Sequence, residues 1–380
     1  MILRSLRRLW VLSVIAVFGA AVAAWPADAE GPSPVEAFYL KKMPAKYASQ
    51  EAYISGIADS GANTVLADLP LLPDGTPDTL GLSNLVYLVH RAKLKIFIIL
   101  PVRALPHVVE AHPAWEDRSF DLAERSVKPS DKIDLFNDEA VAYLRDYVKT
   151  VSAYAVDGFL LGPDVLYSPG DGMGKSALKT AESAKGFSPS PKKMFLEVKD
   201  APGTLKVNKE YEELFGKWQE MKRDRIRSVV EELRTASRAA GGSPRFGMPL
   251  PVTGTTMTSA DLLAHYALDV TMMRNAGMDY FWSVIAYRDI MKQQNMPYRQ
   301  AIELVGRSAF AAMNAVKDVR QCLVVIQASS ADGVSLSTAE IEEVVGIVRK
   351  SGTAGIALQV TPLALPSPVL AKKLFRLPGE

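Results

Sequence analysis

The feature that most constrains the fold is a repeated alternation between two kinds of segment. Short runs of β-branched and other apolar residues alternate with longer segments whose apolar residues recur at helical spacing. The predicted strands are residues 36–40, 63–68, 95–100, 157–161, 245–250, 279–284, 321–327 and 354–359. The predicted helices are residues 50–60, 82–92, 138–154, 211–240, 260–275, 298–316 and 338–350.

This alternation predicts an α/β fold with a parallel sheet and right-handed crossovers. Eight strands within a chain of 380 residues fit a closed (β/α)8 TIM barrel better than an open, doubly wound sheet. The open Rossmann layout is the alternative, but no G-x-G-x-x-G turn follows the first predicted strand. Because no change of composition marks a linker, we expect residues 30–380 to form one barrel.

The segment after the fourth predicted strand does not fit the repeat. Residues 165–209 are rich in Lys, Ser, Pro and Gly and show weak periodicity. Such a segment is too long for an ordinary loop between a strand and a helix. We therefore predict a flexible insertion after strand 4, which is either a lid over the site or a disordered segment.

The N-terminus has the pattern of an export signal. Three arginines within the first eight residues precede an apolar run, residues 9–24, and then the sequence Ala27-Asp28-Ala29. This pattern is typical of a secretory signal cleaved before Glu30. The alternative is an uncleaved anchor, because the apolar run is near the short limit for crossing a bilayer. Both interpretations predict a periplasmic or secreted barrel that meets the membrane, if at all, only through residues 9–24.

The charge balance and the rare residue types argue against several classes of function. Lys and Arg number 44 against 42 Asp and Glu, so we do not expect nucleic acid as a partner. The single cysteine, Cys322, lies in an apolar run and is interpreted as a core residue. The four histidines include no tight ligand spacing. We therefore predict neither a metal nor another cofactor.

Acidic residues follow two of the predicted strands. Active sites of such barrels lie at the C-terminal ends of the strands, which makes Asp164 and Asp68 the candidate catalytic residues. Glycoside hydrolysis ordinarily uses two carboxylates, although the second and fourth strands are not neighbours. No Glu stands at a predicted strand end, which argues against an ordinary retaining glycosidase. Asp164 as the cap of a turn is the structural alternative.

Polar and aromatic side chains near the strand ends are suited to sugars, because aromatic faces stack on sugar rings and polar groups bond the hydroxyls. We therefore expect a polysaccharide or an oligosaccharide as the partner. The predicted substrate-binding residues are Arg103, Trp115, Tyr167, Trp282, Tyr287, Gln327 and Gln359.

Several stretches also carry a resemblance to a known family, and they are Gly61–Val65, Asp134–Val141, Tyr154–Leu160, Trp218–Ile226 and Gln359. In these stretches the chain resembles the glycoside-hydrolase-like (β/α)8 barrels found as the C-terminal domain of the periplasmic poly-β-1,6-N-acetylglucosamine deacetylase, and family-10-like barrels. The resemblance implies binding or cleavage of partly deacetylated poly-N-acetylglucosamine, a biofilm exopolysaccharide.

The resemblance is incomplete at one position that matters for chemistry. The family places a pair of Asp residues, preceded by His, after the strand that here ends at Leu161. The corresponding residues are Gly162, Pro163 and Asp164, so only the second acid remains. One interpretation is a hydrolase in which Asp164 is general acid or electrostatic stabiliser, while Asp68 or the substrate's acetamido group supplies the second function. The others are a non-catalytic glycan-binding barrel and an envelope scaffold that docks a partner protein.

Overall fold

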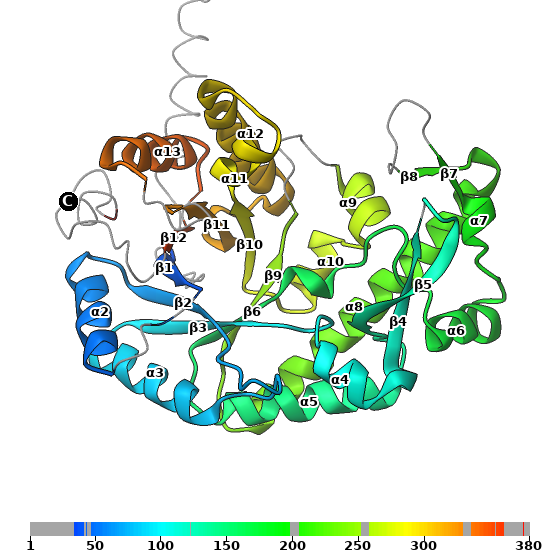
Figure 1. The fold of residues 1–380 in the computed structure, drawn as a ribbon, viewed down its shortest axis with the longest axis horizontal. Helices are drawn as coiled ribbons and strands as arrows, with labels where there is room; N and C mark the ends of the chain where they lie inside the picture. The colour runs from blue at the N-terminus through cyan, green and yellow to red at the C-terminus, as the bar shows by residue number, and fades with distance from the viewer. Residues whose placement is uncertain are drawn as a thin grey trace, which may run out of the picture. The chain divides into compact units, whose positions relative to one another are not determined.

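The protein contains a closed barrel of parallel strands, surrounded by helices (Figure 1). The computed structural model describes residues 34–41, 43, 47–121, 123–197, 205–251, 258–329, 336–353, 355–360 and 375. Around the barrel the strands follow the order β1, β12, β11, β10, β9, β6, β3 and β2. Their bounds are β1 Glu36–Leu40, β2 Thr64–Asp68, β3 Lys95–Leu100, β6 Gly158–Leu161, β9 Arg245–Pro249, β10 Tyr280–Ile285, β11 Cys322–Gln327 and β12 Gly355–Val360. The predicted (β/α)8 TIM barrel is thus confirmed.

Helices follow the barrel strands and cover the outside of the barrel (Figure 1). The longer ones are α2 Tyr47–Asp59, α3 Thr79–Arg91, α5 Asp138–Ser152, α8 Glu212–Ala239, α12 Tyr298–Val316 and α13 Thr338–Lys350. Shorter ones are α4 Pro106–Ala111, α9 Ser259–Tyr266, α10 Val270–Asn275 and α11 Tyr287–Gln293. In the described part of the chain, no helix has both the length and the apolar character that crossing a membrane requires. The predicted export signal lies outside the described residues.

The period of two along each strand builds two apolar layers. On β10, Tyr280 and Trp282 belong to the cluster that fills the inside of the barrel, whereas Phe281 and Ile285 pack in the larger cluster against the helices. Gly247 of β9 leaves room inside the barrel, because a Cβ there would lie 2.4 Å from a methyl group of Leu160. Full burial of one large apolar side chain, such as Phe281, stabilises the fold by about 1.5–3 kcal/mol.

The strand prediction missed the hairpin that precedes α5. The strands β4 Glu116–Asp121 and β5 Ser126–Ile133 form an antiparallel pair in the connection between β3 and α5. Their sequences, EDRSFD and SVKPSDKI, are mostly polar and half-buried, so they carry no apolar run that marks a barrel strand. The hairpin packs outside the barrel instead of joining it.

The predicted helix over residues 260–275 is two helices, α9 and α10. The break falls at Ala267, whose φ of 51° lies in the left-handed region and ends α9. Asp269 then begins α10 by accepting a hydrogen bond from the backbone N–H of Met272. A side-chain cap within a continuous apolar pattern is a weak sequence signal, which explains the missed break.

The predicted insertion after strand 4 contains secondary structure in its described parts. Its elements are α6 Lys175–Lys185, α7 Pro191–Met194, β7 Phe195–Glu197 and β8 Leu205–Val207. A separate apolar cluster joins this insertion to β4 and to the first half of α8, through buried side chains that include Phe120, Met173, Phe195 and Trp218. The insertion therefore has a small core of its own beside the barrel.

Candidate functional site

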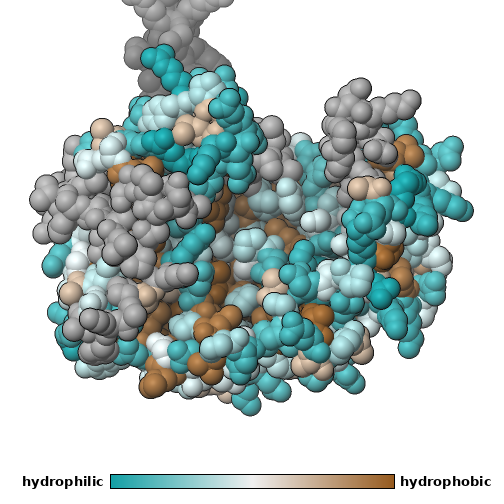
Figure 2. All heavy atoms as spheres, in the orientation of Figure 1, coloured by the Kyte–Doolittle hydropathy of each residue, from teal (hydrophilic) through white to brown (hydrophobic). Residues whose placement is uncertain are grey.

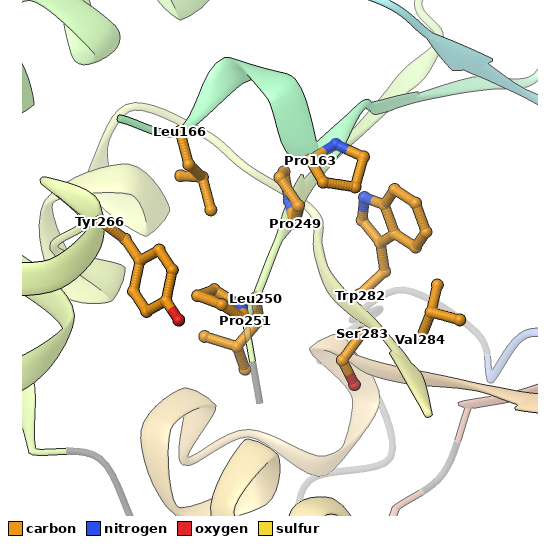
Figure 3. A pocket seen from close by; sticks show the side chains of 9 residues that line it. All are labelled: Pro163, Leu166, Pro249, Leu250, Pro251, Tyr266, Trp282, Ser283 and Val284. Carbon is orange, nitrogen blue, oxygen red and sulfur yellow. The ribbon is translucent and has the colours of Figure 1, made fainter. Parts of the chain in front are cut away.

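Two adjoining pockets open at the C-terminal ends of the barrel strands. The larger, of about 430 Å³, is lined by Tyr39, Lys41, Asp68, Leu69, Leu71, Ile99, Pro101, Gly162, Pro163, Asp164, Trp282, Val284 and Gln359. The smaller, of about 290 Å³, is lined by Pro163, Leu166, Pro249, Leu250, Pro251, Tyr266, Trp282, Ser283 and Val284 (Figure 3). Figure 2 shows apolar side chains inside a hollow of one face, bordered by hydrophilic ones. Pro163, Trp282 and Val284 line both pockets and join them into one groove.

Asp68 is the last residue of β2 and, among the described residues, one of two carboxylates in the larger pocket. Its Oδ1 accepts a hydrogen bond of 2.7 Å from the hydroxyl of Tyr39, which lies on the neighbouring strand β1. Burial raises the pKa of Asp68 above its ordinary value, while the bond from Tyr39 and the positive charge of Lys41 oppose that rise. A half-buried acid that tends to keep its proton is suited to proton donation.

Asp164 is the second carboxylate, in a 3₁₀ turn, Pro163–Val165, directly after β6. Its Oδ2 accepts hydrogen bonds from three consecutive backbone amides, those of Val102, Arg103 and Ala104, at 2.5–2.8 Å. This oxygen therefore holds the loop after β3. Gly162 permits the arrangement, because a Cβ there would lie 2.2 Å from Oδ1 of Asp164.

The two carboxylates reach the pocket from strands that are not neighbours. In the barrel β3 lies between β2 and β6. Since adjacent strands are about 4.8 Å apart, the ends of β2 and β6 are roughly 10 Å apart. Asp164 lies beyond the end of β6, and its Oδ2 binds the loop after β3, so its carboxylate lies beside the end of β3, the strand next to β2.

Two further residues predicted from the sequence line the larger pocket. Trp282 of β10 is 2% exposed, and its indole N–H donates a hydrogen bond of 3.0 Å to the carbonyl of Leu161. Gln359 of β12 pairs in register with Tyr39 of β1 and faces the same pocket. The structure thus brings together Asp68, Asp164, Trp282 and Gln359 from four of the barrel strands or their ends.

Arg103 and Tyr167, which the sequence suggested as sugar contacts, are in the interior. Both have an exposed fraction of 0%. The guanidinium of Arg103 lies 3.8 Å from the centre of the Tyr167 ring and donates to the carboxylate of Asp117 at 2.5 Å. Their side chains bind other protein groups here and do not line either pocket.

Three other predicted contacts also lie away from the two pockets. Trp115 stacks on a neighbouring histidine and donates its indole N–H to Glu139 at 3.0 Å. The buried hydroxyl of Tyr287 donates to Glu340 at 2.8 Å. Oε1 of Gln327, which is 1% exposed, accepts a hydrogen bond from the backbone N–H of Arg288 in the first turn of α11. Each side chain is committed to a partner that the sequence pattern does not reveal.

The prediction missed several pocket residues, of which Tyr39 and Tyr266 are the chemically informative ones. Tyr39 stands in β1 two residues after Ala37, which faces the barrel interior. The strand period of two therefore placed it on the pocket side, although it precedes the strand end by one residue. Tyr266 ends α9, and its ring faces the smaller pocket (Figure 3). Its position depends on the break between α9 and α10.

The site combines a candidate proton donor, a second carboxylate and an apolar wall. The described residues that line the smaller pocket include no charged side chain, whereas those of the larger include Asp68, Asp164 and Lys41. Within the described ranges, no group of three or more His, Cys, Asp or Glu residues is arranged to hold a metal ion. The residues of the groove thus suit acid–base chemistry or the binding of a polar ligand that has an apolar face.

The barrel is similar to solved glycoside hydrolase domains. The PgaB (BpsB) glycoside hydrolase domain from Bordetella bronchiseptica matches with a TM-score of 0.69 and 12% identity over 91% of this chain and 100% of that one. The catalytic domain of β-amylase from Paenibacillus polymyxa matches with a TM-score of 0.53 and 11% identity, covering 86% and 93% of the two chains. A β-galactosidase from Marinomonas ef1 matches with a TM-score of 0.58 and 10% identity over 90% of this chain and 59% of its own.

No protein-family model matches the sequence, and no curated protein sequence matches it. At identities of 10–12% the similarity to the solved structures concerns the fold. The resemblance to the glycoside-hydrolase-like barrels, which rested on short stretches of sequence, is confirmed at that level.

Proposed function

We propose that the protein is a glycan-acting barrel that hydrolyses glycosidic bonds in the groove over its strand ends. The observation that carries this proposal is the larger pocket, in which Asp68 and Asp164 flank a space walled by Trp282. Glycoside hydrolysis ordinarily uses two carboxylates that face each other across the bound sugar. The similarity to solved barrels described as a glycoside hydrolase domain, a β-amylase and a β-galactosidase supports it.

The two carboxylates take different roles in this proposal. Asp68, whose pKa burial raises, gives its proton to the glycosidic oxygen as the bond to the sugar carbon breaks. Asp164, with one oxygen bound by three amides, acts as the acceptor that removes a proton from the attacking water or stabilises positive charge on the sugar.

The substrate we propose is an exopolysaccharide of the poly-N-acetylglucosamine type. The sequence resemblance to the barrels of poly-β-1,6-N-acetylglucosamine deacetylase supports this class. The predicted export signal, residues 1–29, supports a periplasmic or secreted site of action, where such polymers occur.

The test is release of oligosaccharides from partly deacetylated poly-N-acetylglucosamine. Wild type, Asp68→Asn and Asp164→Asn are compared with Asp59→Asn, which changes an exposed carboxylate at the end of α2. We expect release by wild type and the Asp59 variant, and a loss of at least about a hundredfold in each pocket variant. Equal release by all four proteins would refute the assignment of the two acids.

A glycan-binding barrel without turnover is the second candidate. The observation that favours it is that three backbone amides already occupy Oδ2 of Asp164, so this acid has a structural task that persists without chemistry. In that case wild type binds the polymer in a sedimentation or calorimetry assay and releases nothing. Trp282→Ala then weakens binding, whereas Asp164→Asn changes it less.

A further inference from the structure

Arg103 contacts both the side chain and the backbone of the turn that carries Asp164. Its backbone N–H donates to Oδ2 of Asp164 at 2.5 Å. Its guanidinium Nη1 donates to the carbonyl of Leu166 at 2.8 Å and reaches the carbonyl of Asp164 at 3.5 Å. One residue thus holds the carboxylate from one side and the peptide groups behind it from the other.

The guanidinium of Arg103 is itself fixed by a buried cluster. Nη2 donates to Asp117 at 2.5 Å, and Nη1 lies 3.4 Å from Oδ2 of Asp171. The Tyr167 ring lies against the guanidinium, at 3.8 Å from ring centre to carbon. Asp117 also accepts two backbone amides of the insertion, each at 3.1 Å. The cluster therefore connects the hairpin and the insertion to the loop that binds Asp164.

We propose that Arg103 is a positioning residue for Asp164, which it holds at the pocket by binding the Pro163–Val165 turn from two sides. The inference rests on the proposed role of Asp164 in the site. Arginine suits the task because its planar group presents donors in a fixed fork that meets Asp117 and Leu166 at once. A lysine has a single ammonium nitrogen and cannot donate to Asp117 and to Leu166 with the same geometry. Arg103 does not contact substrate in this scheme.

Hydrogen exchange of the backbone amides of residues 102–104 tests the proposal directly. In wild type these amides bind Asp164, and we expect Arg103→Lys to speed their exchange about tenfold, the effect of losing one hydrogen bond. Lys132→Met is the matched control, because Lys132 pairs with the same Asp171 at 3.3 Å but from the hairpin. Unchanged exchange in folded Arg103→Lys, or the same acceleration in Lys132→Met, would overturn the proposal.

A second pair of variants keeps the test valid if Arg103→Lys does not fold. Tyr167→Leu removes the ring against the guanidinium without changing charge. Tyr167→Phe keeps the ring and removes a buried hydroxyl that has no hydrogen-bond partner among the described residues. We expect faster exchange at residues 102–104 in the leucine variant and wild-type exchange in the phenylalanine variant. The same exchange in both variants would contradict the role given to the guanidinium.

Kinetics on the glycan separate positioning from general destabilisation. Arg103→Lys should lower kcat between about tenfold and about a hundredfold with KM little changed, because Asp164 is displaced while the aromatic wall remains. On the Asp164→Asn background the same substitution should have no further effect. An additional loss there would overturn the proposal. If wild type releases no oligosaccharide while the exchange results hold, the proposed hydrolysis fails and the positioning of Asp164 stands.

Discussion

Replacement of Asp134 by Asn should change stability in opposite directions at acidic and at alkaline pH. Asp134 follows β5 and is 1% exposed. Its Oδ1 accepts the N–H of Phe136 at 2.9 Å, and its Oδ2 accepts the N–H of Ala177 at 3.3 Å. Burial, and then the negative charge of Asp117, raise the pKa of Asp134 from 3.8 to about 7. The carboxyl of Asp134 therefore keeps its proton in the folded protein up to about pH 7.

The sign of the effect follows from which state binds the proton. Between pH 4 and pH 7 the folded protein keeps the proton of Asp134 and the unfolded chain releases it, so the free energy of unfolding falls as the pH rises. The slope approaches 1.36 kcal/mol per pH unit, and from pH 5 to pH 8 the loss is on the order of 2–3 kcal/mol. Lys222, whose pKa burial lowers to about 7, gives the opposite slope above pH 7, in wild type and variant alike.

Asparagine cannot ionise, and it keeps only one oxygen for the two amides that Asp134 accepts. The lost acceptor costs about 1 kcal/mol at pH 5, where Asp134 is protonated and neutral. At pH 8 the variant avoids the buried negative charge and should be more stable than wild type by about 1–2 kcal/mol. Urea unfolding of both proteins at pH 5 and pH 8 measures the change of sign. Asp131→Asn, in the exposed part of the hairpin, is the control and should show no crossing.

A difference of equal sign and size at the two pH values would refute this reasoning. It would mean that Asp134 stays ionised in the folded protein. The hydrogen bonds from the two backbone amides would then stabilise the charge by more than burial destabilises it. A shift in the slope of the urea transition, rather than in its midpoint, would point to a change of the unfolded or folded ensemble instead of the charge.

Three shorter predictions concern the groove. Gly162→Ala should displace Asp164, because the new Cβ would lie 2.2 Å from its Oδ1. Thermal unfolding should show a loss of about 1–3 kcal/mol in stability, and the glycan-release assay should show a loss of most activity. Trp282→Phe loses the indole hydrogen bond to β6 and should cost about 1 kcal/mol in a urea titration and weaken glycan binding, with unchanged binding as the contrary result. Tyr39→Phe removes the hydrogen bond that lowers the pKa of Asp68, so the pKa of Asp68 should rise. Because the proton donor then stays protonated to higher pH, activity in a rate–pH profile should also persist to higher pH. A shift of the profile to lower pH would contradict the role of Asp68 as proton donor.

The barrel could be predicted because its signals are local and repeated. The barrel strands are apolar runs, and helices with their own period separate most of them, so small errors at element ends did not change the fold. The hairpin β4–β5 could not be found in this way, because its side chains alternate between half-buried and exposed positions beside the barrel. The break at Ala267 depends on a left-handed backbone conformation that the apolar pattern of residues 260–275 masks.

The position of the two pockets follows from the topology, whereas the contacts of each side chain do not. Asp68 was predicted from its place at a strand end, and it lines the larger pocket together with Trp282 of β10, because the topology brings all C-terminal strand ends to one side of the barrel. Arg103 stands at such an end too, yet its guanidinium turns to Asp117 and Asp171, 14 and 68 residues further along the chain. Nothing near Arg103 in the sequence distinguishes an arginine that faces a ligand from one that meets a carboxylate of a later hairpin.

Asp164 shows why a retained acid is weak evidence of retained chemistry. The strand end marks the residue, but the three amides that bind its Oδ2 come from residues about 60 positions earlier. Losing that carboxylate would leave the N–H groups of Val102 and Arg103, both buried residues, without this acceptor, at a cost of about 1–3 kcal/mol for each, whereas the N–H of Ala104 belongs to an exposed residue. Selection for a stable loop would therefore keep Asp164 in a barrel that only binds glycan. Asp68 has no comparable set of backbone donors among its described bonds, only the hydroxyl of Tyr39, and burial makes its charge unfavourable. An acid kept in such a place gains little for the fold, so the pH dependence of activity through Asp68 is the better indicator of catalysis.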